Sequence, residues 1–289
     1  MNNKIHTTGV SVGVRRVIAY VVLAIVSILC LFWFYVLFIN ATRSHADLTK
    51  GFTPIPSTNL LTNWKNLSAG RAASALPIWN GLFNSFIIAG LSALVSTYFS
   101  SMTAYAIHVS EFKLKKFMFT FILMIMMIPT QVTALGFLQL VGKMGLNDSF
   151  VPLIVPSIAA PVTFFYMKQY MESALPLSLV EAARIDGSGE FRTFNSIVLP
   201  IMKPAIAVQA IFTFVSSWNN YFVPTLILQT DKKKTLPILI AQLRSADWLK
   251  FDMGQVYMMI AFSILPVIVV YLILSKFIVQ GVAMGSVKG

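Results

Sequence analysis

The sequence predicts an all-α integral membrane protein that crosses the bilayer six times. Hydrophobic residues make up 57% of the 289 residues and charged residues only 11%, whereas about 25% of the residues of a soluble domain are charged. The mean hydropathy of +0.76 is correspondingly high. Six stretches contain no Asp, Glu, Lys or Arg, and they match or approach the roughly 20 apolar residues that a membrane helix requires.

These six uncharged stretches divide the chain. As predicted spans they cover residues 17–39, 82–109, 117–141, 150–167, 204–230 and 253–275. The first exceeds the roughly 7–15 apolar residues of a signal peptide, so we predict an uncleaved span. The fourth is the shortest and contains Pro152, Pro156 and Pro161, which are tolerated where neighbouring helices satisfy the freed backbone groups. We therefore expect one transmembrane domain over residues 17–280, with short terminal segments at 1–16 and 281–289.

An even number of spans places both ends of the chain on one side of the membrane. Arg15 and Arg16 precede the first span, and Lys113, Lys115 and Lys116 lie between the second and third spans. Because basic residues are enriched in cytoplasmic loops, we expect cytoplasmic termini. The loops at 41–81 and 231–252 are then extracytoplasmic, and the loop at 168–203 is cytoplasmic. The net charge of +12 is explained by topology and by attraction to anionic lipid, not by nucleic-acid binding.

Residues that could form a catalytic or metal site are scattered along the sequence. Cys30 is the single cysteine, and His6, His45 and His108 have no partner at ligand spacing. The chain contains no GxxxxGK[ST] motif, so we expect no nucleotide-binding P-loop. The Gly-Ser-Gly at 187–189 lacks the spacing of a nucleophile motif and is predicted to be a turn. We therefore expect a protein that is not an enzyme and that holds no metal or cofactor.

The cytoplasmic loop at 168–203 is predicted to form a helix, a turn and a second helix. The segment PLSLVEAARIDG has Pro176 near its start and Gly187 as a C-terminal stop. Helical spacing predicts that one face of the first helix carries Leu179, Ala182, Ala183 and Asp186.

This predicted helix is suited to docking into a groove of another protein. Ala182 and Ala183 allow a close approach, and Glu181, Arg184 and Asp186 supply charges that a partner can pair. The alternative is an amphipathic helix that lies on the lipid headgroups. Such a helix should be richer in Lys and Arg on its polar face, whereas the charges here have mixed sign, so a protein partner is favoured.

Several segments of the chain resemble one family of transport proteins. The cytoplasmic loop is similar to the EAA signature of the permease subunits of bacterial ATP-binding-cassette (ABC) importers, through Glu181, Ala182, Ala183, Asp186, Gly187, Ile197, Leu199, Pro200 and Pro204. The segments IPTQV, SSWNNYFVPTLIL, KTLPI and VAMGSVKG, at 128–132, 216–228, 234–238 and 282–289, resemble the smaller membrane subunit of carbohydrate-uptake importers of the maltose type. The resemblance extends over nearly the whole chain.

The resemblance implies a type I, MetI-like importer fold with six spans, in agreement with the six uncharged stretches. It implies the permease subunit of a binding-protein-dependent importer that translocates a sugar or oligosaccharide by alternating access. Its partners would be a second, related permease, two ATPase subunits that bind ATP and Mg, and an extracytoplasmic solute-binding protein that contacts the loop at 231–252. Glycerol 3-phosphate or a polyol stays open as the cargo. An ion-coupled secondary transporter is less favoured because the predicted spans contain no carboxylate.

The resemblance also implies which residues contact the ATPase. Glu181 would pair with a basic residue of the ATPase, and Gly187 would permit a sharp turn. The full set of coupling residues is Glu181, Ala182, Ala183, Arg184, Asp186, Gly187, Leu199 and Pro200. The tail resembles a segment that reaches between the ATPase subunits, through Gly285, Ser286, Val287, Lys288 and Gly289. The residues alone leave open that this tail is only a frayed terminus.

Candidate residues of the transport path lie in the fifth and third predicted spans, because polar groups at the membrane midplane tend to face a cavity or a partner. The candidates are Gln131, Ser217, Trp218, Asn219, Asn220 and Tyr221. Amides and aromatic faces suit sugars, but the same groups could form hydrogen bonds between permease helices instead. In the second span, small residues recur every four positions and predict close helix packing, namely Ser92, Ser96, Ser100 and Ala104.

Overall fold

The computed structural model describes residues 12–68, 76–245 and 252–285. Within these ranges every regular element is a helix, which confirms the predicted all-α fold. The long helices are α1 (Val12–Ala41), α5 (Ile78–Val109), α9 (Pro161–Ala174), α12 (Leu199–Trp218) and α15 (Met253–Gly285). The shorter ones are α2 (His45–Leu48), α3 (Leu60–Ser68), α6 (Lys115–Ile125), α7 (Thr130–Lys143), α8 (Val151–Ile154), η1 (Val155–Ile158), α10 (Leu177–Ile185), α11 (Glu190–Thr193), η2 (Phe194–Val198), α13 (Phe222–Ile227), η3 (Asp231–Lys233) and α14 (Leu236–Arg244).

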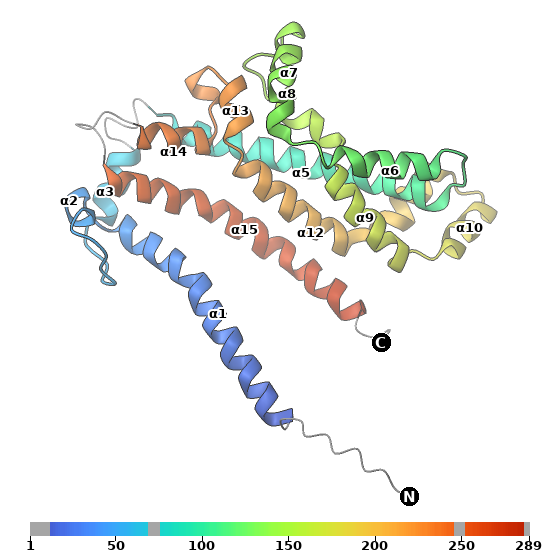
Figure 1. Cartoon of the computed structure of the whole chain (residues 1–289), viewed down its shortest axis with the longest axis horizontal. Helices are drawn as coiled ribbons and strands as arrows, with labels where there is room; N and C mark the ends of the chain where they lie inside the picture. The colour runs from blue at the N-terminus through green and yellow to red at the C-terminus, as the bar shows by residue number, and fades with distance from the viewer. Residues whose placement is uncertain (1–11, 69–75, 246–251, 286–289) are drawn as a thin grey trace, which may run out of the picture.

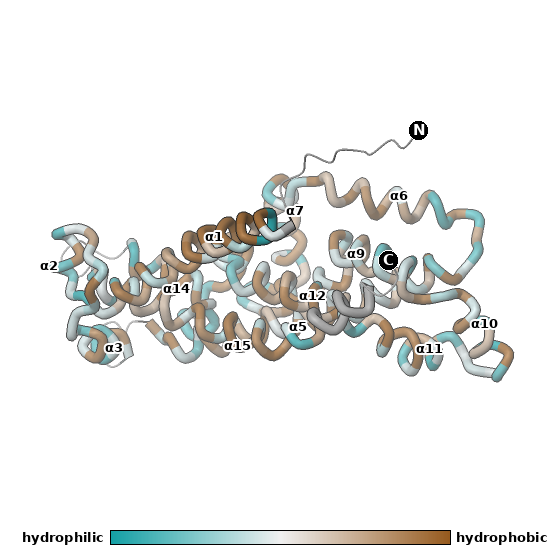
Figure 2. The backbone as a smooth tube through the Cα atoms, turned by 90° about the horizontal axis from the view of Figure 1, so that it is seen from below, coloured by the Kyte–Doolittle hydropathy of each residue, from teal (hydrophilic) through white to brown (hydrophobic). Residues whose placement is uncertain are grey.

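The helices form an elongated bundle with two distinct ends. Helices α2, α3 and α14 gather at one end, and α10 lies at the other (Figure 1). Between the ends, α5 packs against α9 and α12, and α12 packs against α15. Hydropathy colouring shows α1 and α15 apolar over most of their length (Figure 2). The ends carry the polar segments that a membrane protein presents to water.

Five helical runs are long and apolar enough to cross a membrane. They are Gly13–Ala41, Ile78–Val109, Val151–Ala174, Glu190–Trp218 and Met253–Phe277. A sixth candidate is the pair of α6 and α7, which pass the same test together but are bent by 96°. The described residues therefore contain five spans, or six if the bent pair counts as one.

The third predicted span, 117–141, is not one straight helix. Helix α6 ends at Ile125, and α7 begins only after Pro129, which has extended backbone angles (φ −64°, ψ 128°). Proline has no N–H for the helix ladder and disfavours helical angles at the residue before it. The uncharged stretch is therefore divided into two helices at its proline, and α7 stands across the bundle rather than along it (Figure 1).

The fourth predicted span is interrupted where its prolines fall. A 3₁₀ turn, η1, contains Pro156, and α9 starts at Pro161. Between them, Ala159 and Ala160 leave the helical region, with ψ angles of 76° and 87°. The helical run also extends beyond the predicted end at 167, to Ala174. The span is thus longer than predicted but contains a stretch of irregular backbone.

The fifth predicted span, 204–230, was misplaced along the chain. The helix begins near Glu190, includes the π-helical turn η2, and ends at Trp218. Pro200 lies in the first turn of α12, where a missing N–H is tolerated. Pro204 lies in the interior of the same helix. The π turn directly before Leu199 shows that the hydrogen-bond ladder has already changed register there.

The predicted packing stripe on α5 is confirmed. Ser92, Ser96 and Ser100 are 1%, 0% and 2% exposed, and Ala104 is fully buried. The Ser96 hydroxyl lies 3.2 Å from the Thr163 hydroxyl of α9. Ser92 and Ser100 donate to backbone carbonyls of the interrupted fourth span, at 3.4 Å each. The small side chains therefore bring α5 close to the irregular backbone and also provide it with hydrogen-bond partners.

One carboxylate fixes two connections at the end of the bundle that carries α14. Asp148 has a positive φ of 55°, a conformation that Asp tolerates better than most residues. It accepts hydrogen bonds from the backbone N–H groups of Gln229 and Thr230 and from the Thr230 hydroxyl. Lys233 lies 3.1 Å from the same carboxylate. The Thr230 side-chain and backbone bonds hold the pKa of Asp148 well below its usual range.

Replacing Asp148 is expected to loosen this junction. Asp148→Ala removes every side-chain bond and should lower stability by about 1–3 kcal/mol. Asp148→Asn keeps a hydrogen-bond acceptor, so it should lower stability by less than Asp148→Ala. The stability difference between Asp148→Asn and the wild type should depend on pH. Because the folded pKa is lowered, the ionised carboxylate stabilises the fold above its unfolded pKa of about 4, and this contribution is lost as the pH falls further.

Thermal unfolding of the purified protein from pH 3 to pH 7 measures the effect. The difference in Tm between the wild type and Asp148→Asn should narrow below about pH 4. Asp231→Asn is the matched control, because Asp231 pairs only with Lys234 in the same turn and its side chain is 69% exposed. If Asp231→Asn lowered Tm as much as Asp148→Asn, the stabilising role assigned to the Asp148 carboxylate would be contradicted.

Candidate functional site

Helix α10 forms the tip of the bundle, as the loop prediction required. Pro176 is its N-cap, with an extended ψ of 135°, and Asp186 is its C-cap. Gly187 follows with φ of +78°, a left-handed conformation that glycine adopts without steric cost. The Ser188 N–H donates to the Ala183 carbonyl at 2.9 Å, and the Gly187 N–H to the Arg184 carbonyl at 3.0 Å. This pair of bonds is a Schellman motif, and it ends the helix sharply.

The two faces of α10 have different environments. Val180 and Ala183 are buried, and Val180 joins a cluster of core side chains from α5, α9 and α12. We expected Ala183 on the outward face with Ala182, but only Ala182 is exposed. Helical spacing explains the difference, because residues three apart such as 180 and 183 lie on the same side. Ala183 therefore allows α10 to approach its own bundle.

The outward face of α10 mixes acidic and apolar side chains. We name it the tip face, and it consists of Leu177, Leu179, Glu181, Ala182, Ile185 and Asp186, all exposed. Ile185 is 87% exposed, and Phe191 in the next helix is 70% exposed. Large apolar side chains at the tip of a structure, flanked by carboxylates, are typical of a protein contact. This combination is not expected on a helix that lies on anionic headgroups.

Arg184 pairs with a carboxylate of its own chain, although its side chain stays 42% exposed. Its Nε donates to Glu190 at 2.7 Å, and the other oxygen of Glu190 accepts from the Tyr105 hydroxyl at 2.7 Å. The Glu190 hydrogen bond raises the pKa of Arg184 above its ordinary value. One carboxylate of α11 thus joins α10 to α5. We call these three residues the tip network.

The tip is attached to the bundle at further points. His108 Nε2 lies 3.1 Å from the carbonyl of Leu175, just before α10, and a carbonyl accepts only, so the proton belongs on Nε2. The Thr193 hydroxyl donates to Ser188 at 2.9 Å. Phe194 is buried and contacts the Tyr105 ring, with ring centroids 5.6 Å apart. The segment from Leu175 to Phe194 is therefore held to α5 as one unit.

Sequence reasoning missed Tyr105, His108 and Glu190 as parts of this site. Glu190 was assigned only to the second predicted helix, and the other two were assigned to a membrane span. A usable signal was present, since polar side chains in the last two turns of a predicted span must find partners at the membrane surface. The distance of 85 residues between Tyr105 and Glu190 hid the pairing.

The remaining predicted coupling residues are divided between two places. Leu199 is partly buried against the core cluster, and Pro200 is exposed in the first turn of α12. Neither lies on α10. Gly285 is the last residue of α15, and the rest of the predicted ATPase-contact tail, 286–289, lies outside the described residues.

The predicted path residues lie at the end of a helix, not at its midpoint. Trp218 is 3% exposed and stacks on Phe214, with centroids 5.5 Å apart, so its ring is part of the core. Asn219 caps α12, and Asn220 accepts a weak bond from the Val223 N–H at 3.4 Å. Ser217 is half-buried and Tyr221 is exposed. Gln131 lies apart from them in the first turn of α7, where it is exposed.

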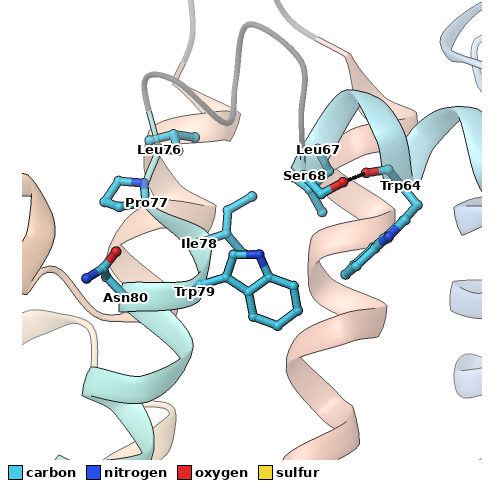
Figure 3. A pocket seen from close by; sticks show the side chains of 8 residues that line it. All are labelled: Trp64, Leu67, Ser68, Leu76, Pro77, Ile78, Trp79 and Asn80. Atoms are coloured by element: carbon cyan, nitrogen blue, oxygen red, sulfur yellow. Dashed lines mark hydrogen bonds between the residues drawn. The ribbon is translucent and has the colours of Figure 1, made fainter.

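Two tryptophans line a pocket at the opposite end from the tip. Trp64 of α3 and Trp79 of α5 have ring centroids 6.2 Å apart at an interplanar angle of 83°, and Phe262 of α15 contacts both. The pocket has a volume of about 240 Å³, and Pro77, Ile78 and Asn80 form part of its wall (Figure 3). This aromatic cluster ties α3, α5 and α15 together.

Comparison with known families decides the class of the protein. Residues 96–284 match the family described as the inner membrane component of binding-protein-dependent transport systems. The chain belongs to this family. The matched region runs from Ser96, in the packing stripe of α5, to the end of α15, and it includes the tip face and the tip network. As a member, the chain is a membrane permease subunit of an ABC transporter, as the EAA pattern predicted.

Relatives in the family carry several names. The arabinooligosaccharides transport system permease protein AraQ of Bacillus subtilis is 37% identical over 72% of this chain and 73% of its own length. The sn-glycerol-3-phosphate permease UgpE of Yersinia enterocolitica is 31% identical over 92% and 95%. The melibiose/raffinose/stachyose permease MelC of Bacillus subtilis is 31% identical over 89% and 91%.

A solved structure shows the same fold. One chain of a bacterial ABC transporter involved in the import of the acidic polysaccharide alginate superimposes with a TM-score of 0.76. The match covers 93% of this chain and 99% of that chain, at 21% sequence identity. The type I permease fold expected from the sequence is therefore confirmed.

The tip network predicts a specific effect of one hydroxyl group. Tyr105→Phe removes the bond to Glu190 and should release α10 from α5 without disturbing the core, because the ring is retained. We expect amide hydrogen exchange in residues 177–189 to become at least several-fold faster, consistent with about 1 kcal/mol for a lost hydrogen bond. Mass spectrometry of the exchanged protein measures this region directly.

Tyr98→Phe provides the matched control for this change. Tyr98 is also on α5, contacts Phe194, and donates to Asn195 at 3.2 Å, but it has no bond to the tip network. Exchange in residues 177–189 should be unchanged in this variant. Equal acceleration in the two variants would assign the effect to general loosening of α5.

Proposed function

We propose that this chain is one of two permease subunits of an ATP-driven importer that carries a neutral sugar or oligosaccharide into the cell. The observation that carries the proposal is the tip face, an exposed acidic and apolar helix surface attached firmly to the membrane bundle of a binding-protein-dependent permease. Two relatives, AraQ and MelC, are named for oligosaccharide transport, which supports a carbohydrate cargo. UgpE supports glycerol 3-phosphate as the second candidate.

In this proposal α10 is the coupling helix and docks into a separate ATPase subunit. ATP and Mg bind to the ATPase dimer, and this chain hydrolyses no nucleotide. Glu181 is exposed on the tip face and is available to a basic residue of the ATPase. Closure of the ATPase dimer moves α10, and the tip network transmits the displacement to α5. ATP then favours the outward-facing state by stabilising it more than the inward-facing one.

A second permease has a natural place beside α1. Only 6% of the most apolar window of α1 is buried in this chain, compared with 44% for α5. Helix α1 contacts α15, but most of its length lies free of other helices (Figure 1). Lipid and a related permease are the two apolar partners available to such a helix. Its exposure supports a heterodimeric assembly in which α1 reaches across to the partner.

Charge and topology support cytoplasmic termini and an extracytoplasmic end at α2, α3 and α14. The chain direction places the start of α1 and the end of α15 away from α14, toward the tip end (Figure 1). Lys113 lies in the connection between α5 and α6, and Lys115 and Lys116 lie in the first turn of α6, at the tip end. Basic residues near the membrane favour the cytoplasmic side. The solute-binding protein then meets the opposite end, where α14 and its flanking loop lie.

Reconstitution of the four components tests the proposal. Proteoliposomes that contain this chain, the second permease, the ATPase and the binding protein should accumulate sugar only when ATP is inside. Collapse of the proton gradient should leave uptake unchanged. A thermal-shift panel of the binding protein with an arabinooligosaccharide, raffinose and glycerol 3-phosphate identifies the cargo. Accumulation by vesicles that lack the ATPase would exclude an ABC mechanism.

Glu181→Lys is expected to uncouple the ATPase from the permease. The substitution reverses a charge on the tip face, so it should reduce sugar-stimulated ATP hydrolysis and transport at least tenfold. Membrane insertion should be normal, because Glu181 is exposed and makes no contact with the core.

Glu111→Lys is the matched control for this prediction. Glu111 lies in the same cytoplasmic region, pairs with Lys115 and has a side chain that is 87% exposed. Its reversal should leave transport unchanged, since it is outside α10. Normal transport by Glu181→Lys would remove this residue from the coupling contact.

A further inference from the structure

A pocket with both polar and apolar lining residues lies between α5, η1, α9 and α12. Its volume is about 290 Å³. Six of the residues that line it have polar, uncharged side chains, namely Ser96, Ser157, Thr163, Gln209, Thr213 and Ser216. The pocket is separate from the tip and from the Trp64–Trp79 pocket.

The pocket lies deep within the membrane-spanning part of the bundle. At a rise of 1.5 Å per residue, Ser96 is about 27 Å along α5 from Ile78 and about 20 Å from Val109. Gln209 and Thr213 belong to the helical run Glu190–Trp218, well inside its ends. Polar side chains at this depth are costly unless they face a partner or water. Their number indicates that the region is not occupied by lipid.

Four of these polar side chains have no hydrogen-bond partner in the described part of the chain. Ser96 and Thr163 bond to each other, but the hydroxyls of Ser157, Thr213 and Ser216 and the amide of Gln209 have no protein partner within 12–68, 76–245 and 252–285. Gln209 is 5% exposed as a whole residue, and the surface that it exposes lines the pocket. An amide at this depth that no protein group satisfies must find its partner inside the pocket. Such a group indicates a ligand or water inside the pocket.

The backbone beside the pocket is also irregular. Ala160 lines the pocket at the point where η1 has ended and α9 has not yet begun. Non-helical backbone at membrane depth occurs where it is buried in protein or borders a water-filled cavity. Ser100 covers the Ala160 carbonyl from the side of α5, at 3.4 Å. The break therefore opens the bundle at the level of Gln209.

We propose that this pocket is a subsite of the transport path that binds the hydroxyl groups of a neutral sugar. The proposal rests on the function proposed above. The Gln209 amide can donate and accept, and three hydroxyls can do the same. The ring of Phe212, 65% exposed at the rim, offers a flat apolar face to a pyranose or furanose. No lining residue is charged, so the subsite has no cation for the phosphate of glycerol 3-phosphate.

Cysteine accessibility tests whether the pocket belongs to a water-filled path. Cys30 is first changed to serine, and Thr213→Cys or Ser216→Cys is added in the complete four-component complex. A charged methanethiosulfonate reagent should modify both positions, with a rate that changes at least tenfold between the nucleotide-free and ATP-trapped complexes. Leu94→Cys is the control, because Leu94 is 64% exposed on the same helix as Ser96 without lining the pocket. Labelling of Thr213→Cys and Ser216→Cys no faster than Leu94→Cys in both states would overturn the proposal.

Transport by Gln209→Leu tests sugar binding itself. This variant should lower the uptake of the sugar bound by the binding protein about five- to tenfold, as expected for lost hydrogen bonds. Its Tm should be equal or higher, since the amide has no protein partner to lose. Gln209→Asn should recover part of the uptake. Unchanged uptake by Gln209→Leu, or a loss matched by a lower Tm, would overturn the subsite.

The two tests separate this inference from the proposed function. A wild-type complex that accumulates glycerol 3-phosphate and no neutral sugar would overturn both the carbohydrate cargo and the neutral subsite. A wild-type complex that transports sugar, with Gln209→Leu also fully active, would leave the proposed function intact and overturn the subsite alone.

Discussion

The structure depends on the requirement that backbone polar groups in a membrane find partners within the protein. Three prolines interrupt the fourth span, and this break exposes carbonyls that hydrocarbon cannot satisfy. In the packing stripe of α5, Ser92 donates to the carbonyl of Leu153. Ser100 adds a second donor to the carbonyl of Ala160, which also accepts from the Phe164 N–H. The same small side chains allow α5 to approach closely, so packing and hydrogen bonding are one feature of this interface.

Helix α5 also connects the two functional regions. Tyr105 near its C-terminal end belongs to the tip network, and Ser96 lines the pocket about 14 Å away along the same helix. Helix α5 is continuous between them. One rigid element therefore joins the tip network to the pocket. In the proposed function, a displacement of α10 would reach the pocket along α5 without a long chain of side-chain contacts.

Composition and motif spacing predicted the class, the all-α fold, the α10 helix and its stop at Gly187. These features follow from local chemistry: uncharged length, the position of a proline, and a glycine at a positive φ. The errors arose where helices bend or end inside an uncharged stretch. Charge patterns cannot give the angle of the bend at Pro129 or locate the end of α12 at Trp218, because both sides of each point are apolar. The predicted path residues 217–221 were misplaced for the same reason, and Gln209 was overlooked as a single amide among apolar neighbours.

The π turn at Phe194–Val198 allows the tip face and the pocket to change independently in evolution. A π turn holds one more residue than an α turn, so every side chain after it is rotated by roughly 100° about the axis. The side of α12 that lines the pocket is thus set here, several turns before Gln209. Gain or loss of this single extra residue would turn a different set of α12 side chains toward the pocket and leave the tip face unchanged.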